Sequence, residues 1–254
     1  MIVKNLLRKL LIFFRLDITK NLQYDRLTRV IMKQNIKKDA HCIDIGCHKG
    51  EILDLMLQYA PHGKHFAFEP IPCLFENLKK KYKDSVQIFP YALSDTSGFS
   101  TFQFVTNAPA YSGLKRRKYD ISNPNIEEIE VEVKTLDEII PFSQKIDFIK
   151  IDVEGGEFGV LKGATHLLKQ NRPVIIFECG KGACEHYGIH PLHVFDFITC
   201  EVGLQIFTLK SYVQNKPPLS RALFEEYFNL NLEYYFVAAK CYISSSAKQQ
   251  FSIL

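Results

Sequence analysis

The chain has 254 residues, of which 46% are hydrophobic and 24% charged, so it is long enough for one large domain, and its composition excludes a disordered, collagen-like or coiled-coil protein. The formal net charge is +4, but residues 1–38 carry ten Lys and Arg against two Asp, a surplus of +8. The remainder therefore has a net charge of about −4, which argues against a nucleic-acid partner for the main body. The seven cysteines have no framework spacing, which indicates reduced thiols in a cytoplasmic protein.

The basic N-terminal stretch predicts two helices, at residues 2–15 and 19–35. They form a helical extension of residues 1–38 before a single domain of residues 39–254. No apolar run reaches the roughly 20 residues that cross a bilayer, and the start of the chain lacks the uninterrupted apolar centre of a signal peptide. Two alternatives stay open for the first helix. It packs on the domain or on a second subunit, or residues 1–16 lie on the inner face of an anionic membrane.

Residues 41–50, HCIDIGCHKG, predict a short buried strand that runs into a glycine turn and then a helix. Asp44, Gly46 and Gly50 follow the pattern D-x-G-x-x-x-G. Glycine is needed where the backbone approaches a ligand, and the helix that follows offers unpaired N–H groups. The spacing differs from the G-x-G-x-x-G of nicotinamide-binding proteins. We expect a cofactor loop here that includes Cys47.

Strand and helix patterns alternate after this turn, which is typical of an α/β fold with a mostly parallel sheet covered by helices on both faces. Two segments with period-two alternation, 99–105 and 126–136, instead predict half-exposed strands around a long polar loop, 106–125. The other predicted strands are 64–70, 86–93, 147–157 (running into a second glycine turn), 173–178, 204–210 and 234–240, and the other predicted helices are 50–60, 74–82, 157–170 and one that begins at His190 and Pro191.

In such sheets ligands bind beyond the carboxyl ends of the strands. Glu69 ends the second strand, where an acidic side chain accepts hydrogen bonds from both hydroxyls of an adenosine ribose, in NAD enzymes as well. Pro70 beside it, and Asp152 on a later strand, are also expected to contact the cofactor. The alternative is that Glu69 is a surface carboxylate before the turn at Pro70. Ala92 and Asp95, after the third strand, can meet the adenine edge, although Ser-Asp-x-Ser-Gly is also ordinary turn chemistry.

The segment KIDVEGGE, residues 150–157, places three charged side chains at alternate positions. Lys150, Asp152 and Glu154 share one side if the strand persists that far. A strand interior this apolar rarely carries three charges without a functional reason. A capped helix start explains Glu157 but not this row of charges. Glu178, at the end of the next strand, adds a carboxylate on the same rim.

The motifs DIGCHKGE, FAFEP, YALSD, YSGL, TLDEI, DFIKIDVEGGE, VLKGA and FE-x-G-K resemble those of the FkbM family of S-adenosylmethionine (AdoMet) dependent methyltransferases, from about residue 41 to about residue 240. The resemblance implies a Rossmann-like seven-stranded fold, AdoMet as methyl donor, and a hydroxyl acceptor on a sugar or secondary metabolite. Carried over by position, it also implies that Asp44, Gly46, Gly50 and Glu69 form the cofactor pocket. Where the family often has Ala-Asn, this chain has Cys47-His48.

For the reaction, the resemblance places Asp152 and Glu154 at the reaction centre. An alcohol is a poor nucleophile until its proton is being removed, so we expect one of these carboxylates to be the base, with Lys150 or Lys181 biasing the pocket electrostatically. The loop 106–120 is long for a structural link and is expected to bind the acceptor. The predicted acceptor-binding residues are Tyr111, Ser112, Lys115, Arg116, Glu178 and Lys181, with Arg117 beside them. A solvated mobile loop is the alternative.

No metal site is predicted. Cys179, Cys184, His186, His190 and His193 are close in sequence, but their spacings match no zinc pattern. Two other functions stay open beside O-methyl transfer to a sugar or glycan hydroxyl: an NAD-type Rossmann enzyme, and a methyltransferase-like partner subunit without activity. The sequence does not decide the acceptor, the oligomeric state or any need for a divalent ion.

Overall fold

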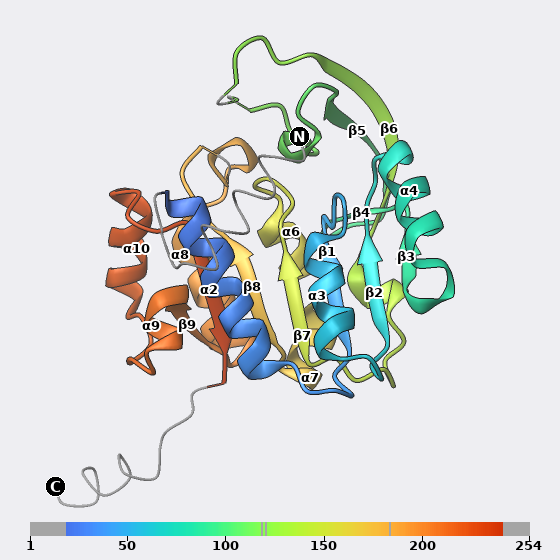
Figure 1. The fold of residues 1–254 in the computed structure, drawn as a ribbon. Helices are drawn as coiled ribbons and strands as arrows, with labels where there is room; N and C mark the ends of the chain where they lie inside the picture. The colour runs from blue at the N-terminus through green and yellow to red at the C-terminus, as the bar shows by residue number, and fades with distance from the viewer. Residues whose placement is uncertain (1–18, 118, 120, 183, 241–254) are drawn as a thin grey trace, which may run out of the picture.

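The computed structural model describes residues 19–117, 119, 121–182 and 184–240 (Figure 1). The helix expected at residues 2–15, and with it the predicted membrane contact of residues 1–16, lies outside the described residues. Within the described ranges, no helix is both long and apolar enough to cross a membrane.

A seven-stranded sheet in the order β3-β2-β1-β7-β8-β10-β9 forms the centre of the fold. Neighbouring strands are parallel except at β10, which runs antiparallel to β8 and β9. Both faces are covered, which explains why β1, β2 and β7 are buried along their whole length. The strands are β1 (Cys42–Ile45), β2 (His65–Phe68), β3 (Gln87–Phe89), β7 (Phe148–Ile151), β8 (Val174–Glu178), β9 (Gln205–Thr208) and β10 (Tyr235–Ala239). The predicted α/β, Rossmann-like class is confirmed.

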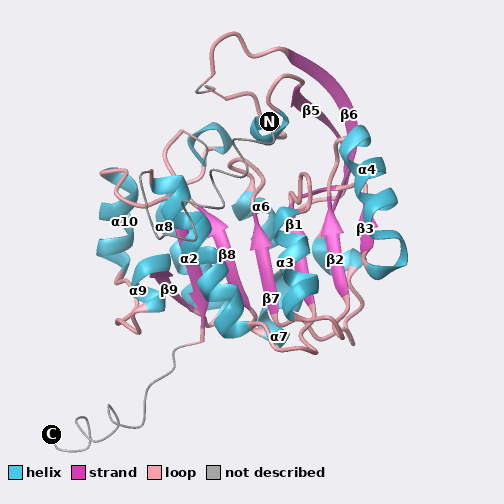
Figure 2. Ribbon diagram, viewed as in Figure 1, coloured by secondary structure: helices cyan, strands magenta, loops and turns pink. Residues whose placement is uncertain are grey.

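Helices pack on both faces of this sheet (Figure 2). One face contacts α2 (Lys20–Asn35), α3 (Glu51–Tyr59), α4 (Pro72–Tyr82) and α9 (Leu209–Val213). The other contacts α5 (Leu136–Ile139), α6 (Glu157–Lys162), α7 (Thr165–Asn171), α8 (Pro191–Asp196) and α10 (Arg221–Asn229). Short 3-10 turns lie at Lys83–Ser85, Pro109–Tyr111 and Cys184–Tyr187, and a π-helical turn lies at Phe197–Val202.

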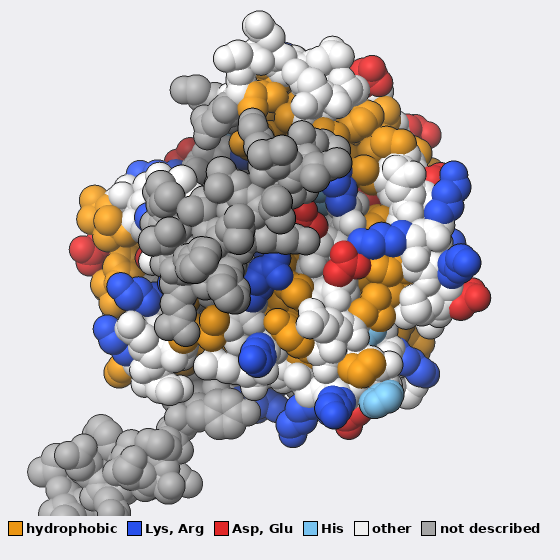
Figure 3. Space-filling model, in the orientation of Figure 1, with side chains coloured by type: hydrophobic (Ala, Val, Ile, Leu, Met, Phe, Trp, Pro, Cys, Tyr) orange, Lys and Arg blue, Asp and Glu red, His pale blue; other side chains and the backbone are white. Residues whose placement is uncertain are grey.

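Helix α2 is the predicted second N-terminal helix. The Thr19 side chain accepts the N–H of Leu22 at 3.3 Å and so caps its first turn. Its inner side buries Tyr24, Ile31 and Met32 in the core that α3 and the sheet also share. This part of the basic extension is therefore integrated with the main core. On the face drawn in Figure 3, Lys and Arg, Asp and Glu, and hydrophobic side chains are interspersed over the described residues.

A second, three-stranded sheet in the order β4-β6-β5 extends from the carboxyl end of the main sheet (Figure 2). It consists of β4 (Ala92–Leu93), β5 (Gly98–Val105) and β6 (Ile126–Lys134). β5 and β6 pair antiparallel over eight residues of β5, from Gly98 opposite Val133 to Val105 opposite Ile126. Their alternating burial matches the predicted half-exposed strands. The loop between them returns over the end of the main sheet.

Several elements differ from those predicted. The strand expected at 86–93 is broken at Pro90, which lacks the N–H that a continued ladder needs, so β3 and β4 belong to different sheets. The helix expected at 157–170 is broken near Gly163, where an added Cβ would lie 2.0 Å from the Ser94 carbonyl oxygen. Helix α10 was not predicted, although Ser220 caps it by accepting the N–H of Leu223 at 3.2 Å.

Candidate active site

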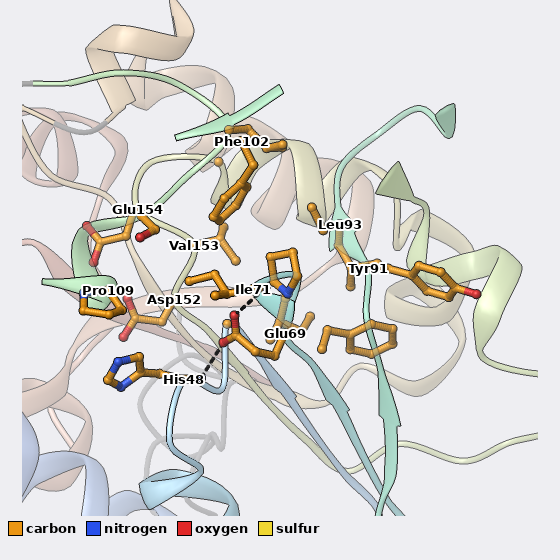
Figure 4. A pocket seen from close by; sticks show the side chains of 18 of the residues that line it. His48, Glu69, Ile71, Tyr91, Leu93, Phe102, Pro109, Asp152, Val153 and Glu154 are labelled. Carbon is orange, nitrogen blue, oxygen red and sulfur yellow. Dashed lines mark hydrogen bonds between the residues drawn. The ribbon is translucent and has the colours of Figure 1, made fainter. Parts of the chain in front are cut away.

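A pocket lies at the carboxyl ends of β1, β2 and β7, where the strand order reverses between β1 and β7 (Figure 4). Such a reversal is where open α/β sheets bind ligands. The pocket encloses about 580 Å³ of empty space, part of which is open to solvent. The lining residues are Ile45, Gly46, His48, Phe68, Glu69, Pro70, Ile71, Tyr91, Ala92, Leu93, Phe102, Pro109, Ala110, Ser112, Leu114, Asp152, Val153, Glu154 and Gly156.

The glycine turn after β1 brings the ends of β1 and β7 together. Gly46 has a φ of 76°, and a Cβ there would lie 1.9 Å from the Asp152 carbonyl oxygen. Gly50 also has a positive φ, of 77°, but it packs against Tyr82, whose hydroxyl donates to the Gly50 carbonyl at 2.8 Å. Cys47 is buried in the core. Gly46 thus lines the pocket, whereas Gly50 and Cys47 do not.

Glu69 is held rigidly on the pocket wall. It is 3% exposed, and its two carboxylate oxygens accept the N–H groups of His48 at 2.8 Å and Ile71 at 3.0 Å (Figure 4). Burial raises the pKa of Glu69 to about 7. Two donors fix the carboxylate in orientation while leaving each oxygen able to accept a further hydrogen bond.

Asp44 lies beneath the pocket rather than on its wall. It is 2% exposed and stands in register opposite Lys150 on β7. Its Oδ2 has no hydrogen-bond partner. Burial raises the pKa of Asp44 to about 7, and the Lys150 ammonium lowers it in part.

Lys150, Asp152 and Tyr235 form one hydrogen-bonded group at the end of β7. The Lys150 ammonium is 2.9 Å from Asp152 Oδ2, and the Tyr235 hydroxyl donates to the same oxygen at 2.8 Å. The ammonium also lies 4.6 Å from the centroid of the Tyr235 ring. Lys150 is 4% exposed, so a cation is buried directly beside the carboxylate. Tyr235 comes from β10 and could not be predicted from local patterns.

Glu154 does not continue the row of Lys150 and Asp152. β7 ends at Ile151, and Glu154 has a φ of 60°, which is uncommon for a residue other than glycine and turns the chain. Its carboxylate pairs with the Arg117 guanidinium, and both side chains are largely buried. β7 therefore ends too early for Lys150, Asp152 and Glu154 to lie on one side of it, as the sequence predicted. Glu154 still lines the pocket, next to Asp152 (Figure 4).

The segment 109–117, here called the arm, covers the pocket from the loop between β5 and β6. Ser112 is 7% exposed, and its hydroxyl oxygen accepts the N–H of Val105 at 3.0 Å. Gly113 forms a backbone bridge with Gln103. Arg117 ties the arm to Glu154 and lies 5.4 Å from the centroid of the Tyr111 ring. These contacts hold the arm in place, so it forms an ordered wall of the pocket.

The other predicted acceptor residues lie further from the pocket. Lys115 and Arg116 are exposed, and Tyr111 is not among the lining residues. The Lys181 ammonium donates to the Asn229 carbonyl at 2.6 Å. Of the predicted cofactor residues, Pro70 and Ala92 line the pocket, whereas Asp95 pairs with Lys162 outside it.

Glu178 is half-buried at the end of β8, beside Asp152 and Glu157. Each of these three carboxylates offers an oxygen within 4.8 Å of the other two, and they are the one such group among the described residues. Burial, together with the neighbouring Glu157 and Asp152 charges, holds the pKa of Glu178 well above its usual range. The sequence cluster that includes His186 and His190 forms no comparable group within the described ranges.

Several pocket residues were missed by sequence reasoning. Ile71, Leu93 and Phe102 give the pocket an apolar side that faces Glu69 (Figure 4). His48 was noted only as a departure from a family pattern, yet its backbone N–H orients Glu69. The strand-end rule pointed to this region for Ile71 and Leu93, whereas Phe102 enters from the second sheet.

Residues 44–203 match a family model described as the methyltransferase FkbM domain. "Methyltransferase 1" of Beauveria bassiana (strain ARSEF 2860) is 25% identical over 145 residues, which cover 49% of this chain and 58% of that protein. "Methyltransferase sdnD" of Sordaria araneosa is 25% identical over 160 residues, which cover 51% and 62%. The chain thus spans about three fifths of the length of these curated relatives.

Among solved structures, methyltransferase FkbM from Methylobacillus flagellatus KT aligns at 15% sequence identity with a TM-score of 0.49. The alignment covers 80% of this chain and 44% of that one.

Proposed function

The chain belongs to the FkbM methyltransferase family, and from this premise we propose that it is an AdoMet-dependent O-methyltransferase acting on a hydroxyl of a sugar or glycan. One observation carries the proposal beyond the family. A single pocket joins a fixed carboxylate, Glu69, suited to a ribose, with a charge-balanced carboxylate, Asp152, suited to a reacting hydroxyl.

The residues present fit an adenosyl cofactor. Glu69 is oriented by two backbone donors and would accept hydrogen bonds from the ribose hydroxyls. Ile71, Leu93 and Phe102 provide an apolar surface on which an adenine would lie. Gly46 lets the end of β1 approach the Asp152 carbonyl closely, which brings the Glu69 and Asp152 sides of the pocket together. His48 Nε2 is buried without a partner on the same wall and is free to meet a polar ligand atom.

Once bound, AdoMet supplies an electrophilic methyl group on a sulfonium. We assign the base to Asp152 rather than Glu154, because the Glu154 carboxylate is already paired with Arg117. Lys150 and Tyr235 both donate to Asp152 Oδ2, which leaves Oδ1 for the proton of the acceptor hydroxyl. Proton removal by a positioned carboxylate contributes about 10²–10⁴-fold to such reactions. The arm excludes water from this side of the pocket and aligns the reactants.

The acceptor class rests on the chemistry of the arm. Arg117 pairs with Glu154, which lines the pocket, so guanidinium donors and carboxylate acceptors for hydroxyl groups lie together at this wall. Lys115 and Arg116 are exposed to solvent, whereas Arg117 contacts Glu154, which lines the pocket. Because Glu154 neutralises that cation, a neutral polyhydroxyl acceptor is favoured over a phosphate-bearing one.

The proposal is tested by methyl transfer from labelled AdoMet to a panel of sugars and glycans. Asp152→Asn should lower turnover by about 10²–10⁴-fold while S-adenosylhomocysteine (SAH) still binds. Glu154→Gln should lower it less. Full turnover by Asp152→Asn would show that the base lies elsewhere, and no transfer to any hydroxyl acceptor would contradict the assigned reaction.

A further inference from the structure

Three carboxylates converge beside the pocket with too little positive charge to balance them. Asp152, Glu157 and Glu178 each offer an oxygen within 4.8 Å of the other two. Lys150 pairs with Asp152, which is the only residue with which it forms an ion pair in the described part of the chain. Within the same described ranges, Glu157 and Glu178 form no ion pair.

A second observation concerns Glu157 itself. The residue is 2% exposed, and its Oε1 accepts the N–H groups of Val153 at 2.9 Å and Gly155 at 3.3 Å. Through these bonds Oε1 satisfies two backbone donors of the turn after β7. They leave Oε2 buried without any hydrogen-bond partner. A buried carboxylate oxygen without a partner is unfavourable, so the turn alone does not account for a glutamate here.

We propose that Asp152, Glu157 and Glu178 bind a hard divalent cation of the Mg²⁺ or Mn²⁺ type. A set of carboxylate oxygens is the ligand chemistry that these ions prefer. With Lys150 the three carboxylates carry a formal charge of −2, which one divalent cation neutralises. Glu178, unlike Glu157, is only half-buried. This proposal differs from the expectation from sequence, which included no metal site.

The position of the site gives the cation a use in the proposed reaction. Asp152 is shared between the carboxylate group and the pocket wall, so the ion lies beside the place assigned to the acceptor hydroxyl. Because Lys150 and Tyr235 occupy Asp152 Oδ2, the ion and the acceptor proton use the two lone pairs of Oδ1. A bound divalent ion stabilises a developing alkoxide and orients the oxygen that carries it. This use rests on the proposed function, whereas binding of the ion does not.

The test is a titration of the purified full chain with Mn²⁺, followed by electron paramagnetic resonance of the free ion, without AdoMet or acceptor. The wild type should bind one Mn²⁺ saturably. Glu178→Gln should weaken binding by roughly 10–100-fold, and Asp152→Asn by a similar factor. Glu185→Gln, which removes the same charge from an exposed residue nearby, should leave the affinity unchanged.

Two results overturn the site: no saturable Mn²⁺ binding by the wild type, or equal affinities in wild type and Glu178→Gln. Circular dichroism and SAH binding show whether each variant is folded. Loss of Mn²⁺ binding with SAH binding intact is the pattern expected of Glu178→Gln. A wild type that binds Mn²⁺ but not SAH would keep the cation site and contradict the proposed function.

Discussion

Replacing Lys150 with methionine tests whether this buried cation balances Asp152. The substitution keeps the apolar stem and removes the ammonium, which is 2.9 Å from Asp152 Oδ2 and 4.6 Å from the Tyr235 ring centroid. Breaking a fully buried pair costs about 3–5 kcal/mol, and exposed pairs contribute about 0–1 kcal/mol. The side chains here are 6% and 34% exposed, so solvent screening applies to one partner only. We expect a coupling free energy of about 1–2 kcal/mol, between these limits.

The assay is urea denaturation of four proteins: wild type, Lys150→Met, Asp152→Asn and the double variant. A double-mutant cycle is needed because removing a buried ammonium also relieves its desolvation. The exposed pair of Arg221 and Asp196, with side chains 54% and 43% exposed, is the control cycle and should couple more weakly. A coupling for Lys150 and Asp152 no larger than that of the control, or one abolished by about 1 M salt, would refute the reasoning.

Three further predictions concern packing, pH and the arm. Gly163→Ala places a Cβ 2.0 Å from the Ser94 carbonyl oxygen and should lower the unfolding free energy by about 1–3 kcal/mol, so an unchanged melting temperature would contradict that packing. Burial raises the pKa of Glu69 from 4.5 to about 7, so between these pH values the folded protein holds a proton that the unfolded chain has released, and stability falls as pH rises. Because glutamine does not titrate, Glu69→Gln should remove on the order of 3 kcal/mol of this pH-dependent loss of unfolding free energy, measured by urea denaturation. The same pH dependence in wild type and variant would contradict the raised pKa of Glu69. Glu154→Gln removes the ionic partner of Arg117 and should speed hydrogen exchange in the arm, whereas unchanged exchange would mean that the pair does not anchor it.

The sequence patterns located the site because parallel strands end at one edge of a sheet. That rule pointed to Glu69 and Asp152, the family resemblance gave them their predicted roles, and both line the pocket. The glycine pattern was less informative about side chains. Gly46 marks a close approach of two strand ends, but Gly50 marks packing against Tyr82. A glycine spacing describes backbone geometry, so it does not say which neighbouring side chains face the ligand.

The remaining features depend on tertiary structure that no local pattern contains. Glu154 was expected to continue a strand, but its φ of 60° is set by the turn into α6 and by the arm. Tyr235 reaches Asp152 only because β10 inserts antiparallel next to β8, with Tyr235 opposite Glu178. That register joins positions 83 residues apart in the chain. The second sheet likewise brings Phe102 to the pocket, from a strand that the sequence predicted only as half-exposed.

The most direct test of the central claim is calorimetric titration of the purified chain with SAH, with NADH as the comparison ligand. The account predicts stoichiometric SAH binding that Glu69→Ala weakens by about 10–100-fold, because a charge-assisted hydrogen bond to the ribose contributes about 1.5–3 kcal/mol. Glu132→Ala, which removes a carboxylate from β6 outside the pocket lining, is the matched control and should bind SAH as the wild type does. Absence of SAH binding, or a preference for NADH, would contradict the assignment of this pocket to AdoMet.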